Sequence, residues 1–237
     1  MTPGMMDALK QRLEAWQRRL TAKIGGDIST PEARRAAGWH YTLMDHGFLR
    51  VWWHNLHQVA PGVFRSNQPS GPQLTEWHRK LGLKTVLNLR GASNQSFHLF
   101  EAEACEALGI RLIDLPMAAA GAPRVLVVQQ LIELFQTVEK PLLIHCKSGA
   151  DRTGLAAALY QLVIEGKPIE EAKKQVSLKY LHVAHSVAGI QDHFLRTYEA
   201  AFRKTGIGFM DWLQTEYDPK ALKASFLRWR AGDRDAM

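Results

Sequence analysis

The stretch "HCKSGADRTG", residues 145–154, lies between two apolar segments, "PLLI" before it and "LAAALYQLVI" after it. The first run is short and ends at a turn, which is typical of a buried strand. The second run is long enough for a buried helix. The sequence therefore predicts a strand ending at Cys146, a tight loop, and a helix beginning near Arg152. In such a unit the loop N–H groups and the helix N-terminus point at one spot, which is well placed to bind an anion.

The loop carries the residues that phosphate binding needs. Gly149 lets the backbone curl where a side chain would interfere. Arg152 adds a planar fork of donors that suits two phosphate oxygens at once. We expect the phosphate to be held by the backbone and side chains of Lys147, Ser148, Gly149, Ala150, Asp151 and Arg152.

Cys146 is the candidate nucleophile. A thiol at this position faces a positive helix end and a guanidinium group, and both favour the reactive thiolate. A thiolate beneath a bound phosphate is in line for attack on phosphorus. Thr153 could donate a hydrogen bond to the sulfur, which would make it a better leaving group in a second step.

The Cys-x5-Arg spacing followed by threonine resembles the protein tyrosine phosphatase superfamily, in its dual-specificity-like branch. Here the match consists of His145, Cys146, Gly149, Arg152 and Thr153. The upstream segment "VFRSNQPSGPQLTEWHRKLGLKTVLNLRG" is similar to the opening of bacterial members, so the resemblance covers about residues 59–180. It implies phosphomonoester hydrolysis through a cysteinyl-phosphate, with no cofactor and no metal.

The remaining sequence predicts an α/β fold with a mostly parallel sheet between helices. Residues 1–57 read as a helical N-terminal extension packed on the core, and residues 58–237 as the cysteine phosphatase domain with a helical C-terminal part. The expected strands are "GVFRSN", "KTVLNLR", "IRLIDLPM" and "PLLIHC". The expected helices are 5–24, "STPEARRAAGW" capped by Thr30, "SGPQLTEWHRKLG", "SFHLFEAEACEALG", "PRVLVVQQLIELFQTVE", 152–165, 168–180, 186–204 and 207–230, the last with a break near Asp218.

The general acid is less defined. Members of the family usually carry an aspartate on a loop that here reads "LPMAAAGAPR", without a carboxylate. Asp114, at a strand end, and Asp151, inside the phosphate loop, are the candidates. A general acid must reach the leaving oxygen. Asp151 is nearer to it along the chain and is preferred, although both aspartates could instead be structural carboxylates.

The net charge of the chain favours an anionic partner. The 237-residue chain has a formal net charge of +7, spread along its length. We expect a phosphorylated substrate and no nucleic-acid partner. Two cysteines, no secretory signal pattern and no long apolar run predict a cytoplasmic protein. The tryptophan-rich segment "FLRVWWHNLH" reads either as core or as a peripheral contact with the inner membrane face.

The sequence does not decide between two classes of substrate. A phosphoprotein, with tyrosine preferred, is the first. A phosphorylated lipid head group or inositol phosphate is the second, because Lys147 adds charge for a polyanionic ligand. The alternative to an enzyme is a phosphate-binding pseudophosphatase, which only the missing loop carboxylate supports.

Overall fold

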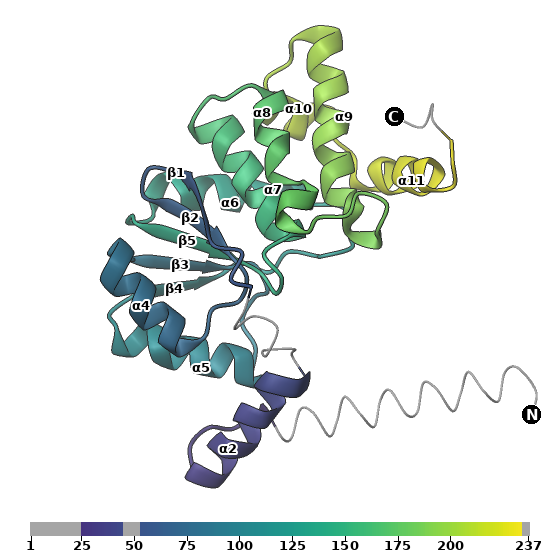
Figure 1. The fold of residues 1–237 in the computed structure, drawn as a ribbon. Helices are drawn as coiled ribbons and strands as arrows, with labels where there is room; N and C mark the ends of the chain where they lie inside the picture. The colour runs from purple at the N-terminus through teal and green to yellow at the C-terminus, as the bar shows by residue number, and fades with distance from the viewer. Residues whose placement is uncertain (1–24, 45–52, 234–237) are drawn as a thin grey trace, which may run out of the picture.

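The computed structural model describes residues 25–44 and 53–233, in which a five-stranded sheet forms the centre of the molecule (Figure 1). The strand order is β1-β2-β5-β3-β4, with β2, β5, β3 and β4 parallel and β1 antiparallel to β2. The strands are β1 (His57–Ala60), β2 (Val63–Ser66), β3 (Thr85–Asn88), β4 (Arg111–Asp114) and β5 (Leu142–His145). The mostly parallel α/β sheet is thus confirmed, and β1 is an addition to the strands expected.

Helices cover both faces of the sheet, which explains why every residue of β3 and β5 is buried. On β5, Leu143 faces one core with Leu74 and Trp77, whereas Leu142 and Ile144 face the other. The first face carries α4 (Gly71–Leu81) and α5 (Ser96–Ala107), and the second carries α6 (Val125–Thr137), α7 (Asp151–Leu159) and α9 (Ile190–Thr205) (Figure 1).

The chain after α7 differs from the predicted helices in one respect. A helix was expected over 168–180, but α8 (Ile169–Ala172) is followed only by short 3₁₀ turns at Lys173–Gln175 and Leu178–Tyr180. The buried Arg65 explains this, because it binds the backbone carbonyl of Gln175 and lies over the Tyr180 ring. Tertiary contacts therefore override the local helical pattern.

The C-terminal helices follow the prediction closely. The chain continues from α9 into α10 (Phe209–Thr215) and α11 (Pro219–Arg230). Asp218 begins α11 by accepting hydrogen bonds from the N–H groups of Lys220 and Ala221, as expected of a capping residue before proline. No helix in the described ranges is long and apolar enough to cross a membrane.

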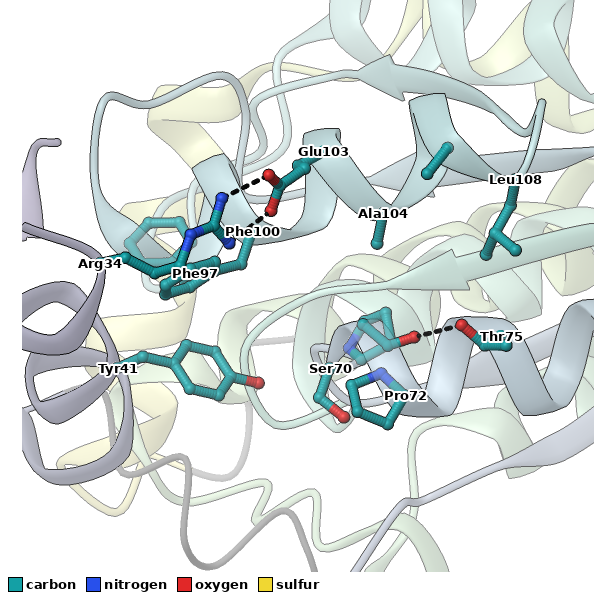
Figure 2. Close-up of a pocket in the computed structure, with 13 residues that line it drawn as sticks. Arg34, Tyr41, Ser70, Pro72, Thr75, Phe97, Phe100, Glu103, Ala104 and Leu108 are labelled. Carbon is teal, nitrogen blue, oxygen red and sulfur yellow. Dashed lines mark hydrogen bonds and ion pairs between the residues drawn. The ribbon is translucent and has the colours of Figure 1, made fainter. Parts of the chain in front are cut away.

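The described part of the N-terminal region packs on α5. Thr30 caps α2 (Pro31–Trp39), as predicted. Arg34 forms a bidentate ion pair with Glu103, and Tyr41 meets Phe100 edge to face. Between these contacts and α4 lies a cavity of about 580 Å³ lined mainly by apolar and aromatic groups (Figure 2). The helix expected over 5–24, and Arg50 and Trp52, fall outside the described residues.

Candidate active site

The phosphate loop begins where the central strand β5 ends, and α7 begins directly after it. Gly149 has φ +73°, which few residues other than glycine adopt. A Cβ there would lie 2.6 Å from the carbonyl oxygen of Ser66 and 2.7 Å from the amide nitrogen of Asn67. The loop thus rests against the end of β2 so closely that only glycine fits.

Arg65 supports the loop from below. It is fully buried, and its Nη2 donates to the Gly149 carbonyl at 2.6 Å. Its Nη1 donates to the backbone and side-chain oxygens of Gln175 at 2.7 and 2.8 Å, and its guanidinium lies 3.8 Å from the centre of the Tyr180 ring. The position of Arg65 beneath the loop makes it a supporting residue.

Burial lowers the pKa of Arg65 to about 10, against the opposing effects of Tyr180 and Cys146. The guanidinium therefore stays positive at neutral pH. Its charge lies under the loop that carries Cys146, where it favours an anionic sulfur or a bound anion.

Two further hydrogen bonds hold loop carbonyls from outside. The backbone N–H of Gln68 donates to the Lys147 carbonyl at 3.2 Å, and Asn55 Nδ2 donates to the Ser148 carbonyl at 3.2 Å. The same Asn55 group also donates to the Tyr180 carbonyl at 3.2 Å. Because the N–H and C=O of a peptide point in opposite directions, carbonyls fixed outward leave the loop amides turned toward its centre.

Cys146 is a free cysteine with 2% of its surface exposed. Behind it, Nε2 of His145 lies 2.8 Å from Oε1 of Glu101, and both side chains are completely buried. Thr153, in the first turn of α7, is also fully buried, and its hydroxyl has no hydrogen-bond partner among the described residues. Glu101 was missed, because its partner is 44 positions away in the sequence.

Arg152 lies in the first turn of α7, directly after the loop. Its Nη1 is 3.3 Å from the Leu89 carbonyl and 3.4 Å from the Met117 carbonyl, in the segments that follow β3 and β4. The side chain is half-buried. Lys147 is also partly exposed, whereas Ser148 is exposed at the rim. The phosphate-binding residues predicted from the sequence thus lie on one loop and one helix end.

Asp151 has a partner that the sequence did not suggest. Its Oδ1 lies 2.8 Å from Nδ1 of His182, a side chain that is 2% exposed. The histidines at 182 and 185 have a spacing that could suit a metal, but His185 stacks on Trp229 at 4.5 Å instead. Among the described residues no group of three or more metal-type ligands occurs.

Asp114 belongs to a different network. Asn88, its neighbour across the β3–β4 pair, donates from Nδ2 to Asp114 Oδ1 at 2.7 Å. Nε2 of His98 lies 2.8 Å from the other carboxylate oxygen. These two contacts hold Asp114 at the end of β4.

The segment without a carboxylate, residues 115–124, is held at three of its carbonyls by one buried side chain. Gln191 Nε2 lies 3.0 to 3.3 Å from the carbonyls of Ala118, Ala119 and Gly121. Gln191 is fully buried at the start of α9. Nothing in the sequence pattern marks this residue, because its role depends on a contact about 70 positions away.

Residues 57–195 match a family model described as "DSP-PTPase phosphatase fused to NAD+ Kinase". The chain belongs to this phosphatase family. The dual specificity protein phosphatase TpbA of Pseudomonas aeruginosa is 30% identical over 162 residues, which are 64% of this chain and 67% of TpbA. The protein is therefore a cysteine phosphatase of the dual-specificity type, as the sequence predicted.

Solved structures share the fold. The crystal structure of P. aeruginosa TpbA matches with a TM-score of 0.50 and 23% identity, covering 63% of this chain and 91% of TpbA's. The core catalytic domain of the PP-IP phosphatase SIW14 from S. cerevisiae matches with a TM-score of 0.53 and 18% identity, covering 65% and 94%. These similarities confirm the fold of the phosphatase domain.

Proposed function

We propose that this phosphatase hydrolyses phosphomonoesters in two steps, with Cys146 as the nucleophile. The thiolate attacks phosphorus, the ester oxygen leaves, and a cysteinyl-phosphate forms. Water then attacks that phosphorus, inorganic phosphate leaves and the thiolate returns. The observation that carries the proposal is the outward fixing of three successive loop carbonyls, at Lys147, Ser148 and Gly149, around the buried sulfur.

This arrangement supports a role for the loop in charge stabilisation. Amides that face the equatorial oxygens of a bound phosphate would need no reorganisation as charge develops, which is usually the largest contribution to catalysis. Arg152 would add two donors, and the buried charge of Arg65 supports the loop from beneath. Thr153, with its buried hydroxyl, would stabilise the sulfur as it leaves in the second step.

We propose Asp151 as the general acid. Asp151 lies beside the phosphate loop at the start of α7, and the 2.8 Å contact between its Oδ1 and Nδ1 of His182 would hold its carboxyl group in place there. Asp114 is the alternative, but its two partners, Asn88 and His98, tie it to the end of β4. Donation from Asp151 would neutralise the leaving oxygen during the first step.

The substrate would be a phosphorylated protein or a phosphorylated lipid head group or inositol phosphate. The relatives' names point both ways, since TpbA is a dual specificity protein phosphatase and SIW14 is a PP-IP phosphatase. Lys147 at the rim supports a ligand with more than one negative charge.

The test is phosphate release from phosphotyrosine and phosphoserine peptides, short-chain phosphoinositides, phosphatidylglycerophosphate and soluble inositol phosphates. Each assay includes Cys146→Ser as the control. We expect release that depends wholly on Cys146. Phosphate binding without release from any of these substrates would contradict the proposal and make the protein a pseudophosphatase.

A further inference from the structure

The segment between α8 and α9 exposes four aliphatic side chains within ten residues. The exposed fractions are 75% for Leu178, 56% for Leu181, 50% for Val183 and 59% for Val187. Single exposed apolar residues are ordinary, but several together mark a surface that contacts something else. We call residues 178–187 the apolar loop.

The backbone at Leu181 strengthens this reading. It has φ +65°, a left-handed conformation that is unfavourable for a residue with a branched side chain. Glycine or asparagine would adopt it more easily, and burial of the leucine side chain does not compensate for the strain. The folded chain gains little from leucine here, so its side chain is better explained by a contact outside the chain.

The apolar loop is bound to the phosphate loop on both sides of Leu181. The Tyr180 carbonyl accepts from Asn55 Nδ2, the same group that donates to Ser148. His182 contacts Asp151. A surface that receives Leu181 would therefore lie next to the opening above Cys146.

The basic residues nearest the apolar loop lie on the loop itself and on α11. Lys179 is exposed among the aliphatic groups, whereas Lys173 and Lys174 pair with Glu199 and Glu171. The stack of His185 on Trp229 joins the loop to α11, where residues 219–230 carry four basic residues, no carboxylate and the 52% exposed Leu227. Aliphatic groups surrounded by basic ones suit an anionic bilayer.

We propose that the apolar loop is a membrane-contact surface that presents the phosphorylated head group of a lipid to Cys146. Side chains that are half to three-quarters exposed project from the surface. A bilayer accepts projecting aliphatic groups without a shaped complement, whereas a protein partner would have to supply pockets for them. This inference rests on the proposed function, because it names the substrate class of the same site.

The test combines two assays on the full chain. Sedimentation with phosphatidylcholine vesicles, with or without phosphatidylglycerol, measures binding in a Cys146→Ser background. Turnover on soluble p-nitrophenyl phosphate and on vesicle-borne phosphoinositide measures activity in chains that keep Cys146. The test variant is Leu178→Gln with Leu181→Asn, because asparagine suits the left-handed backbone. The matched control is Leu43→Gln, at a leucine that is 54% exposed near α2.

We expect the protein with the unsubstituted apolar loop to bind anionic vesicles. The double variant should lose about tenfold or more in vesicle binding and in vesicle-borne turnover, since two buried leucines contribute that much. Soluble turnover should stay within about twofold for both variants, because neither substitution changes a group that touches phosphate. Leu43→Gln should behave as the unsubstituted chain.

Equal vesicle binding by the double variant and its parent, or no binding by the parent, would overturn the membrane proposal. Loss of turnover on a phosphotyrosine protein without any vesicle binding would instead make the loop a protein-docking surface. Absence of turnover on every substrate would overturn the proposed function alone, because vesicle binding by Cys146→Ser is measured independently.

Discussion

At the scale of single residues, the two cysteines have opposite environments. Cys105 is a buried residue of α5, and burial, with Glu101 and Asp114, raises its pKa to about 12. Cys146 lies at the N-terminus of α7, above the charge of Arg65. The sheet separates the two, and both are free.

Alkylation should therefore distinguish them. At neutral pH, iodoacetamide should modify Cys146 and leave Cys105 unmodified, because only a thiolate reacts and Cys105 stays protonated. Peptide mass spectrometry locates the label, and excess inorganic phosphate should slow the reaction by occupying the loop. Labelling of Cys105 at a comparable rate would show that the buried thiol is not protected as described.

Asp151 and Asp114 can be distinguished by how the effect of each substitution on turnover depends on the leaving group of the substrate. Asp151→Asn should lower turnover of an alkyl phosphate by about a hundredfold and of p-nitrophenyl phosphate much less, because a good leaving group needs no proton. Asp114→Asn should change both substrates alike and modestly, through loss of its contacts with Asn88 and His98. Steady-state kinetics with the two substrates is the measurement, and the reverse pattern would assign the acid to Asp114.

At the scale of elements, the strand–loop–helix unit of β5 and α7 depends on contacts beneath the loop. Gly149→Ala would put a Cβ within 2.6 Å of the Ser66 carbonyl. We expect destabilisation of about 1–3 kcal/mol and a large loss of turnover, because the left-handed backbone and the clash both oppose alanine. Gly82→Ala is the control, since Gly82 is also left-handed but has open space around it.

Denaturant unfolding and kinetics on both glycine variants would check this prediction. Gly82→Ala should lose stability while keeping turnover of the folded protein. Equal turnover in the two variants would mean that the loop tolerates displacement from β2.

Arg65 is predicted to act through the loop and not on substrate. Arg65→Met leaves the carbonyls of Gly149 and Gln175 without their donor, at a cost of about 2–4 kcal/mol in unfolding free energy. Affinity for inorganic phosphate, measured by titration calorimetry, should fall as the amides lose their orientation. Unchanged phosphate affinity in a folded variant would contradict the supporting role.

The features of the helices, strands and loops that the sequence predicted depend on contacts between neighbouring residues. Pro31 with Thr30, Gly82 after α4 and Gly149 in the loop each act through their nearest neighbours, so their positions could be read directly. Asn55, Gln191 and His182 could not, because each acts on a partner 31 to 125 positions away. The helix expected over 168–180 was wrong for the same reason, since Arg65 draws Gln175 and Tyr180 toward the loop.

At the scale of the whole molecule, buried histidines make stability depend on pH. Burial lowers the pKa of His193 below its usual 6.5, partly offset by Asp192, and burial likewise lowers that of His57. The folded state therefore prefers neutral imidazoles, and protonation favours the unfolded chain. This contribution to stability is complete above about pH 6.5 and is lost as the pH falls through the lowered values.

Denaturant unfolding at about pH 7.5 and about pH 5.5 should show a lower free energy of unfolding at the acidic pH. His193→Gln, which can keep the hydrogen bond to Ser225, should lose part of this difference. A pH dependence of the same size in the variant would remove His193 from the explanation.

At the carboxyl end of β5 the chain enters the phosphate loop with Cys146, the proposed nucleophile, and the apolar loop contacts that loop through Asn55 and His182. The central claim is that Cys146 becomes covalently phosphorylated during turnover. The most direct measurement is rapid acid quench with a radiolabelled phosphomonoester, followed by peptide mapping. Transient label on Cys146, and none in Cys146→Ser, is the predicted result, whereas label elsewhere or undiminished phosphate release from Cys146→Ser would contradict it.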